Sequence, residues 1–424
     1  MRLNITEKIL LAHTDREEIS PGEIIEARVD LALGNDITAP LAIKKFKAAG
    51  IKKVFNRERI ALVCDHFVPN KDAPSARQCR MVEDFARDFK INHFYPLGEG
   101  GIEHVLLPEA GLVLPGDLII GADSHTCTYG ALGAFSTGVG STDLAAVWIT
   151  GKIWLRVPES MKFIYSGKLR PWVGGKDLIL HTIGDIGVSG ATYKAMEFTG
   201  PAIKHLSMDD RFSMCNMAIE AGAKSGIIEA DKITRKYINS VASRLSLVSS
   251  KRFYKSDRNA RYCDMREYDV SKLQPQVACP HLPSNVKPVG ELKKVSIDQA
   301  VIGSCTNGRI SDLMTAARVL KNKKANSRVR LIVFPGTQQI YQEALKMGLM
   351  DIFIDAGATI CPPTCGPCLG GHMGVLGDKE VAIATTNRNF RGRMGALTSK
   401  VYLSNPAVAA ASAVHGTITH PGES

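Results

Sequence analysis

Short apolar runs recur along the chain, and several end abruptly in small and polar residues. The run at 59–64 leads into an Asp-His pair, the run at 117–120 into Gly-Ala-Asp-Ser-His, and the run at 300–302 into Gly-Ser-Cys. A run at 353–360 precedes a cysteine-rich turn, and one at 381–385 leads into an Asn- and Arg-rich loop. Open α/β sheets bind ligands beyond the carboxyl ends of their strands. The pattern therefore predicts an α/β fold in which five loops share one cleft.

Segments with apolar residues at helical spacing lie between these runs. Helices are predicted at 7–13, 41–49, 75–89 and 312–320. Asp36 and Thr38 are expected to cap the helix at 41–49, and Ser311 is expected to cap the helix at 312–320. The alternating segment at 24–30 predicts a half-buried strand. Strands and helices thus alternate along much of the chain, as an α/β architecture requires.

The composition agrees with a compact enzyme of more than one domain. A chain of 424 residues is too long for a single core, so we expect two or three domains. The first residues contain no small-residue cleavage site, and no uncharged apolar run reaches the length that spans a membrane. We therefore expect a cytoplasmic protein. In that reducing compartment the ten cysteines indicate buried thiols and metal ligands rather than a disulfide framework.

The formal net charge of +11 is compatible with nucleic acid, an acidic partner or anionic substrates. No compact basic block is present, and the densest basic stretch, 232–266, lies on a Ser-rich background. We interpret this stretch as a solvated insertion. A salt-sensitive shift of tRNA or duplex RNA by the purified protein would contradict that interpretation.

Three thiols are the first candidates for chemistry. Cys365 and Cys368 form a Cys-x-x-Cys pair in a Gly-Pro turn, and Cys305 lies in a second turn rich in Gly and Asn. The pair alone is shared by zinc knuckles, thiol redox sites and iron-sulfur clusters. Electron-transfer clusters use four cysteines, so a set of three indicates a 4Fe-4S cluster with one iron open to substrate. Cys361 extends the pair to Cys-x3-Cys-x2-Cys, and spacing alone leaves it as another candidate ligand or as a buried thiol.

Two acid-imidazole motifs follow predicted strands. Asp65-His66 and Asp123-Ser-His125 each place a carboxylate beside an imidazole ring. A neighbouring carboxylate orients the ring and changes its proton affinity, which suits acid-base catalysis. Either pair alone has a structural role as its alternative. Two such pairs at two strand ends favour a functional site.

Further charged residues extend the candidate site. Asp143 follows a glycine run, and Glu220 lies in an apolar, helix-like stretch, with capping or a buried salt bridge as the alternative role for both. Arg388, Arg391 and Arg393 share one Gly-containing loop. Guanidinium groups bind carboxylates through two parallel hydrogen bonds, so this loop predicts a carboxylate site, with a solvated basic loop as the alternative.

Four motifs carry a resemblance to a known family. They are Gly303-Ser-Cys-Thr-Asn-Gly-Arg309, Thr364-Cys-Gly-Pro-Cys-Leu-Gly-Gly371, Gly121-Ala-Asp-Ser-His-Thr-Cys127 and Thr386-Asn-Arg-Asn-Phe-Arg-Gly-Arg-Met-Gly395. In this order, and over essentially the whole chain, the sequence resembles the aconitase superfamily. Within it, the chain is similar to the large subunits of the two-subunit dehydratases that act on isopropylmalate or homoaconitate. The resemblance implies three α/β/α domains around a central cluster cleft, at 1–168, 169–288 and 289–424, with the swivelling domain on a separate subunit.

The resemblance also implies a cofactor and a role for each site residue. The cofactor is a 4Fe-4S cluster with one labile, substrate-binding iron. The implied cluster ligands are Cys305, Cys365 and Cys368, which leaves Cys361 as a bystander. The implied catalytic residues are Asp65, His66, His125, Asp143 and Glu220. The implied substrate-binding residues are Thr38, Asn387, Arg388 and Arg393, while Arg391 falls at a variable position.

Two departures from aconitase narrow the implied function. Aconitase has Gln in the loop that contains Thr38 here, so citrate is not the expected substrate. The Tyr-Gly-x-Gly-Ser-Ser-Arg type motif that carries the family's catalytic serine does not occur in this sequence. A separate small subunit, in a heterodimer or heterotetramer, is therefore expected to supply that serine.

The implied reaction is the isomerisation of 2-isopropylmalate and 3-isopropylmalate by dehydration and rehydration in leucine biosynthesis. The large subunit of homoaconitase or of 2,3-dimethylmalate dehydratase is the alternative within the same class. Two alternatives belong to other classes. One is an iron-responsive RNA-binding protein, and the other is a zinc or electron-transfer protein.

Overall fold

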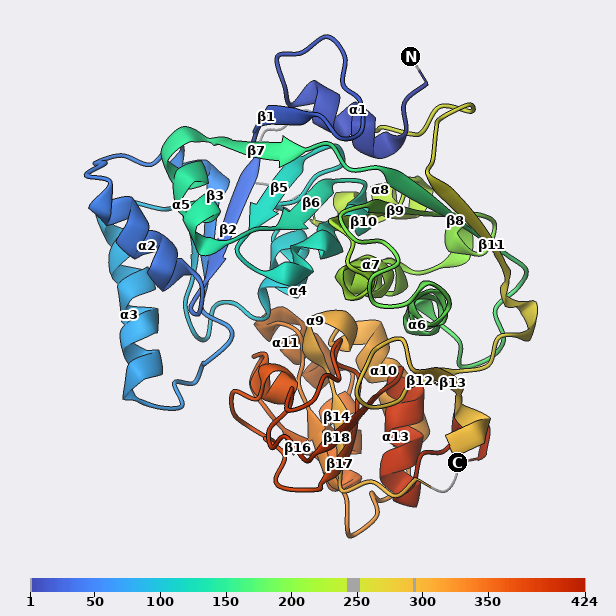
Figure 1. The fold of residues 1–424 in the computed structure, drawn as a ribbon. Coiled ribbons are helices and arrows are strands. Elements are labelled where there is room, and N and C mark those ends of the chain that lie inside the picture. Colours follow the sequence, from blue (N-terminus) through green and yellow to red (C-terminus); the bar gives the residue numbers. More distant parts are fainter. Residues whose placement is uncertain (1, 242–251, 293–294, 424) are drawn as a thin grey trace.

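The computed structural model in Figure 1 describes residues 2–241, 252–292 and 295–423. Three sheets, each built around parallel strands, follow one another along the chain. They lie at the left, the right and the bottom of the view, and their helices meet near its centre. The predicted α/β class is confirmed. None of the helices in the described residues has the length and apolar character that a membrane span requires.

The first sheet has five parallel strands in the order β4-β3-β2-β5-β6. Its strands are β2 (Leu31–Asn35), β3 (Ile60–Val63), β4 (His93–Tyr95), β5 (Leu118–Gly121) and β6 (Phe135–Gly138). Its helices are α2 (Ala39–Ala48), α3 (Ala73–Asp88), α4 (Glu103–Glu109) and α5 (Ser141–Thr150). Phe46, Phe85 and Trp148 of α2, α3 and α5 pack on one face, whereas α4 and the 3-10 segment η2 (Ser124–Leu132) cover the other. Burial on both faces explains why these strands are continuous apolar runs.

The second sheet has four parallel strands in the order β10-β9-β8-β11. The strands are β8 (Ser160–Ser166), β9 (Ala195–Thr199), β10 (Ser225–Ile227) and β11 (Asp264–Asp269). The helices are α6 (Gly175–Ile186), α7 (Met208–Asn216) and α8 (Lys232–Val241). After α7 the chain continues into a 3-10 turn, η4 (Met217–Ala221), which carries Glu220. Helices α6 and α7 face the centre of the molecule (Figure 1).

The third sheet has seven strands in the order β13-β12-β18-β17-β14-β15-β16. Its parallel part contains β14 (Gln299–Ile302), β15 (Arg330–Val333), β16 (Thr359–Ile360), β17 (Val381–Ala384) and β18 (Lys400–Leu403). β12 (Gln276–Ala278) and β13 (Val286–Pro288) are added antiparallel at one edge. Its helices are α9 (Ser304–Asn307), α10 (Ile310–Leu320), α11 (Gln338–Lys346), α12 (Leu349–Asp355) and α13 (Pro406–His415).

A small N-terminal unit completes the fold. α1 (Ile5–Ala12) begins with a capping box, in which the Asn4 side chain accepts from Glu7 N and the Glu7 side chain accepts from Asn4 N. β1 (Ile24–Arg28) pairs antiparallel with β7 (Lys152–Arg156) as a two-stranded sheet. The strand predicted at 24–30 therefore ends two residues early, and the chain enters β2 directly afterwards.

Three local predictions are wrong for identifiable reasons. Residues 353–360 begin inside helix α12 and only end in β16, because a short apolar segment does not distinguish helix from strand. α10 begins at Ile310, its first turn is closed by Asp312 accepting from Arg309 N, and Ser311 donates to Asp209 instead. Thr38 makes no capping bond to α2.

The sheets divide the chain slightly differently from the predicted domains 1–168, 169–288 and 289–424. β8 lies before the first predicted boundary but pairs with β9. β12 and β13 lie before the second predicted boundary but extend the third sheet. We therefore propose three domains whose limits fall between β7 and β8 and between β11 and β12.

The basic stretch at 232–266 is only partly an insertion. Its first residues form α8, which buries Thr234, Ile238 and Val241, and its last residues enter β11, an edge strand of the second sheet. Arg244 and Lys251 lie outside the described residues. The apolar positions of α8 explain why this highly charged stretch still packs against the rest of the domain.

Candidate active site

A cavity of about 260 Å³ lies where loops from the first and third sheets meet. It is lined by Asn35, Ile37, Thr38, Asp65, His66, Ile102, Glu103, His104, Asp123, Ser124, His125, Cys305, Cys365, Cys368, Leu369, Asn387, Arg388 and Arg393. All five loops that follow the apolar runs contribute to this lining. The predicted shared cleft is confirmed.

The three predicted thiols reach this cavity from two turns of the third sheet. Cys305 lies in the single turn α9, directly after β14. Cys365 directly precedes the 3-10 turn η8 (Gly366–Leu369), and Cys368 lies within it. Gly366 has φ +52°, and a Cβ at this position would lie 2.6 Å from the Phe334 ring. Only glycine therefore lets the pair turn so tightly. Cys361 is buried but does not line the cavity.

Amide groups surround the thiols. The Nδ2 atoms of Asn216 and Asn387 donate to Cys305 Sγ at 3.3 and 3.2 Å, and Cys368 Sγ donates to Asn387 Oδ1 at 3.5 Å. Burial raises the pKa of the Cys305 thiol to about 12. Metal binding requires thiolates, so a metal that binds here must displace protons. N–H donors aimed at sulfur suit the thiolate form that ligates iron.

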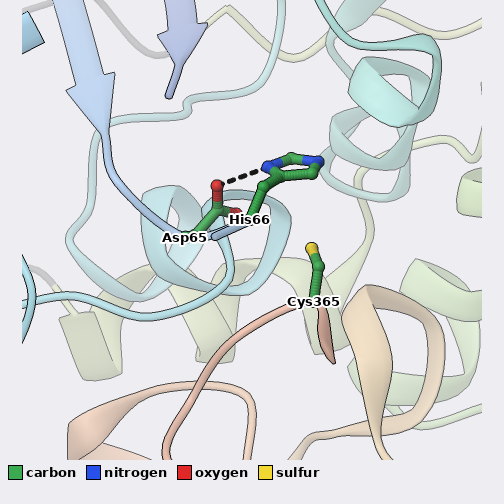
Figure 2. A group of neighbouring side chains, drawn as sticks. All are labelled: Asp65, His66 and Cys365. Atoms are coloured by element: carbon green, nitrogen blue, oxygen red, sulfur yellow. Dashed lines mark hydrogen bonds and ion pairs between the residues drawn. The ribbon is translucent and has the colours of Figure 1, made fainter. Parts of the chain in front are cut away.

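Asp65, His66 and Cys365 lie together at the boundary between the first and third sheets (Figure 2). His66 Nδ1 lies 2.7 Å from Asp65 Oδ1, and Asp65 Oδ2 accepts from Glu103 N at 2.8 Å. Burial alone lowers the pKa of His66, but Cys365 and Asp65 outweigh burial and hold this pKa well above its usual value. Asp65 therefore engages the Nδ1 atom of this ring and not its Nε2 atom.

Asp36 fixes the backbone of this loop. Its carboxylate accepts from the backbone N–H groups of Asp65, His66 and Phe67 at 3.1, 3.0 and 2.9 Å. The expected capping of α2 is thus wrong for Asp36, which is fully buried and joins two neighbouring strand ends. No local sequence signal distinguishes this role from capping.

His125 and Arg388, which come from the loops of the first and third sheets, both contact the carboxylate of Glu220. His125 Nε2 and Arg388 Nε lie 2.9 and 2.7 Å from Glu220 Oε1. Burial by itself raises the pKa of Glu220, but the hydrogen bond with His125 and the charge of Arg388 outweigh it, so the pKa is lowered. Glu220 is therefore ionised at neutral pH and orients both partners, although it lies behind the cavity wall.

A second acid-imidazole pair lies beside His125. Asp123 Oδ1 accepts from His125 N at 2.7 Å and lies 2.9 Å from His104 Nε2. Burial lowers the pKa of His104, and the carboxyl of Glu103 has a pKa raised well above its usual value by burial and then by Asp65 and Asp123. Burial and the two neighbouring carboxylates therefore favour the protonated form of Glu103.

Glu103 and His104 line the cavity but were not singled out from the sequence. They follow a glycine-rich segment at 98–101, and they begin α4. An acid-imidazole pair directly after such a segment is the signal that would have found them, since the same pattern marks Asp65-His66.

The predicted carboxylate-binding residues also reach the cavity. Thr38, Asn387, Arg388 and Arg393 all line it. Thr38 Oγ1 donates to Asn35 Oδ1 at 2.9 Å, which aims the Thr38 loop at the cavity. Arg393 Nε is a buried donor without a hydrogen-bond partner in the described residues. A buried unpaired guanidinium donor at a cavity wall fits an anionic ligand.

Two predicted residues lie elsewhere. Asp143 is exposed at the start of α5, accepts from Gly140 N at 3.3 Å and borders a different hollow, which also contains Lys224. The structure therefore does not bring Asp143 to the cavity, and helix capping explains its position. Arg391 is exposed and does not line the cavity.

The sequence pattern of the aconitase family (aconitate hydratase) matches residues 7–416. The chain belongs to the aconitase family. Membership implies a 4Fe-4S cluster, and the donors present fit one. Three cysteines line the cavity, amides donate to one of them, and no fourth cysteine of residues 2–241, 252–292 and 295–423 joins them. A four-cysteine electron-transfer centre does not match this set.

Close relatives of this aconitase-family chain match it from end to end. A protein of Thermodesulfovibrio yellowstonii named 3-isopropylmalate dehydratase large subunit is 63% identical over 423 residues, which cover 100% of this chain and 99% of that one. A protein of the same name from Syntrophus aciditrophicus is 62% identical, with 100% of both chains covered. The Pyrococcus abyssi protein named 3-isopropylmalate dehydratase large subunit 1 is 60% identical, with 100% and 99% covered.

Among solved structures, aconitase X of Thermococcus kodakaraensis in its holo-form aligns with a TM-score of 0.49 and 12% identity. The alignment covers 92% of this aconitase-family chain and 94% of that one. Family membership rests on the sequence match and not on this distant likeness.

Proposed function

We propose that this chain is the large, cluster-bearing subunit of a 3-isopropylmalate dehydratase. It would interconvert 2-isopropylmalate and 3-isopropylmalate by dehydration and rehydration in leucine biosynthesis, in the cytoplasm. The observation that carries the proposal is the 63% identity over the full length with a relative of that name. Homoaconitate and 2,3-dimethylmalate are the rival substrates, because the cavity residues recognise carboxylates and hydroxyls rather than the side group.

The cluster would be held by Cys305, Cys365 and Cys368. A 4Fe-4S cluster with three thiolate ligands supplies one iron that acts as a Lewis acid toward the departing hydroxyl group. The hydrogen bonds from Asn216 and Asn387 to Cys305 Sγ support this assignment, since N–H donors stabilise thiolate charge.

Residues of this chain would protonate the departing oxygen and orient it. The pKa of His66 is raised by Cys365 and Asp65, and its Nε2 is not engaged by Asp65, so it is the proposed general acid. His125 would orient the hydroxyl group, because its Nε2 is held by Glu220 and its backbone by Asp123. Holding these rings in place removes a reorganisation cost from the reaction step.

The substrate carboxylates would bind the arginine loop. Arg393 has a buried Nε without a partner in the described part of the chain, and Arg388 is pinned through its Nε, which leaves its two terminal nitrogens for substrate. Asn387 and Thr38 line the same wall. Guanidinium groups match carboxylates in bidentate geometry, so the spacing of Arg388 and Arg393 would set the substrate's orientation.

A small subunit would complete the site. The printed names of the relatives describe large subunits, which supports a partner. The base that removes the carbon-bound proton is not among the residues assigned above, and the serine motif of the family is absent from this sequence. We propose that the partner supplies that serine in the swivelling domain, within a heterodimer or heterotetramer.

Anaerobic reconstitution with iron, sulfide and the small subunit tests the proposal. The complex should form an unsaturated acid from 2- or 3-isopropylmalate, detected by its ultraviolet absorbance. This reaction should be faster than the dehydration of 2,3-dimethylmalate or of the hydroxy acids that yield homoaconitate. Cys365→Ser in the same complex is the matched control and should abolish activity. Activity with none of these hydroxy acids, or undiminished activity and iron content in Cys365→Ser, would refute the proposal.

A further inference from the structure

A buried lysine connects the second sheet to the turns that carry the thiols. Lys176 is the second residue of α6 and is 1% exposed. Its Nζ donates to Thr385 O at 3.0 Å and to Thr386 O at 2.6 Å, directly after β17. A helix of one sheet thereby holds the strand end of another. None of the roles assigned above uses this residue.

Lys176 has no carboxylate partner of its own. The described residues form no ion pair with it, and the oxygens of the adjacent Asp177 accept from Gly174 N, Gln276 N and Asn405 Nδ2. Removing an ammonium group from water costs several kcal/mol unless nearby negative charge compensates it. Two carbonyl dipoles compensate only part of this cost. The cation must therefore be balanced by another charge in its surroundings.

Burial lowers the pKa of Lys176 to about 8, and negative charge on Cys305, Asp312, Cys368 or Asp177 acts in the opposite direction. These four groups are therefore the candidates for the balancing charge. Burial raises the pKa of Asp312 to about 7, so this carboxyl is only partly ionised at neutral pH. The remaining partners outside the helix of Lys176 are two of the three cysteines, whose charge appears when they bind metal as thiolates.

The hydrogen bonds of Lys176 converge on the same cysteines. Thr385 Oγ1 accepts from Gly303 N and donates to Gly303 O, both at 2.8 Å, and so fixes the turn that leads to Cys305. Thr386 precedes Asn387, which contacts the sulfurs of Cys305 and Cys368. The ammonium group thus holds the two peptide carbonyls on which this arrangement depends.

We propose that Lys176 is a positioning residue of the cluster site, which clamps the Thr385 and Thr386 carbonyls and supplies the positive charge that balances the Cys305 and Cys368 thiolates. This assignment rests on the proposed function, because it presumes a resident 4Fe-4S cluster. Coupling between the two charges is reciprocal: the lysine favours cluster binding, and the cluster favours the buried ammonium group.

The test compares Lys176→Met, which keeps the length of the side chain and removes its charge, with Lys176→Arg and with Lys224→Met. Lys224 is a matched control because its Nζ also donates to a backbone carbonyl, Gly138 O at 3.1 Å, but borders the hollow outside the cavity. Each full-length chain is reconstituted anaerobically with iron and sulfide. Iron and sulfide per chain, the rate of iron loss to a chelator, the reduction potential followed by electron paramagnetic resonance, and the Tm with and without cluster are measured.

Lys176→Met should lose iron about 10–100-fold faster than the wild-type chain, as expected for the loss of a group that supports metal ligands. Its cluster should have a more negative reduction potential, because a nearby positive charge favours the reduced, more negative form. The Tm should fall further in the cluster-loaded chain than in the cluster-free chain, because the Thr385 and Thr386 carbonyls lose their donor in both, whereas the balancing charge is lost only when the cluster is bound. Lys224→Met should match the wild-type chain in iron loss and potential, and Lys176→Arg should retain the wild-type potential.

A purely structural lysine gives a different result. Lys176→Met would then lower the Tm equally with and without the cluster and leave the potential unchanged, which would overturn the assignment. If Lys176→Met does not yield folded protein, a shifted potential in Lys176→Arg would overturn it equally. A wild-type chain that assembles no 4Fe-4S cluster would refute the proposed function itself, whereas normal cluster assembly with an unchanged Lys176→Met would refute only the role of the lysine.

Discussion

Replacing Glu220 by Gln tests the carboxylate that His125 and Arg388 share. The side chain is buried, and both partners bind the same Oε1 atom, at 2.9 and 2.7 Å. Glutamine keeps the shape and one acceptor oxygen but removes the negative charge. Arg388, whose side chain is only 20% exposed, is then left as a largely buried cation without an ion-pair partner among the described residues.

The expected cost follows from these contacts. Removing one partner of a buried ion pair costs about 3–5 kcal/mol. The lower value applies here, because Arg388 keeps some exposure and glutamine still accepts a hydrogen bond. An unfolding entropy of about 2.1 cal/mol/K per residue amounts to roughly 0.9 kcal/mol/K for 424 residues. Glu220→Gln should therefore lower the Tm at pH 7 by about 3 °C.

The pH dependence supplies an independent check. The pKa of Glu220 is lower in the folded chain than in the unfolded chain, so its stabilising contribution is complete above the unfolded value of about 4.3 and is lost as the pH falls through the folded value. The Tm difference between wild type and Glu220→Gln should be constant from pH 7 to about 5 and shrink in more acidic buffer. Differential scanning calorimetry of the cluster-free chains measures both quantities.

Glu197→Gln is the matched control. Glu197 is also buried and accepts from Ser256 Oγ and Tyr262 OH at 2.7 and 2.9 Å, but it has no cationic partner in the hydrogen-bond geometry of the described residues. Burial raises its pKa, so its ionised form opposes folding at pH 7, and Glu197→Gln should leave the Tm unchanged or raise it. A Glu220→Gln chain as stable as the wild type at pH 7, or a difference that grows in acid, would refute the reasoning.

Three further substitutions separate ligands from neighbours. Asn387→Ala removes an amide that contacts the sulfurs of Cys305 and Cys368, so iron retention after gel filtration should fall about 10–100-fold, and unchanged retention would contradict the contact's role. Cys361→Ser should keep the full iron and sulfide content, because this buried thiol lies outside the cavity lining, and iron loss equal to that of a ligand variant would show otherwise. Asp143→Asn should leave kcat and KM of the reconstituted complex near wild type, since Asp143 is an exposed helix cap, and a tenfold or larger fall in kcat would restore the catalytic role predicted from the sequence.

Patterns at strand ends predicted the location of the site, because a buried parallel strand produces an apolar run and the loop after it is the usual place for ligands. The loops of Asp65, His125, Cys305, Cys365 and Asn387 all reach one cavity for this reason. Residue roles that depend on loops meeting across sheets were harder to predict. The sequence marked Glu220 as a carboxylate in an apolar, helix-like stretch, but nothing near it in sequence signals its contacts with His125 and Arg388.

The failures have a common physical origin. Asp36 and Ser311 have the composition of helix caps, but their side chains bind backbone or side-chain groups of distant segments. Local propensity favours caps for such residues, whereas tertiary contacts decided their partners. Likewise, Lys176 has no distinctive local pattern, and its importance appears only when Thr385 and Thr386 are placed beside it.

The turn that carries the Cys-x-x-Cys pair is hydrogen-bonded to two backbone carbonyl groups in the loop that follows β3 of the first sheet. Cys365 N and Thr364 Oγ1 donate to Asp65 O at 3.0 and 2.7 Å, and His372 Nε2 lies 3.1 Å from His66 O. These contacts join the loop of Asp65 and His66 to the turn of Cys365 and Cys368 through backbone carbonyl groups, which are independent of the rotamers of the surrounding side chains. Under the proposed function, a covering small subunit would therefore admit and release substrate by its own displacement, while these contacts keep the spacing between His66 and the cysteine pair.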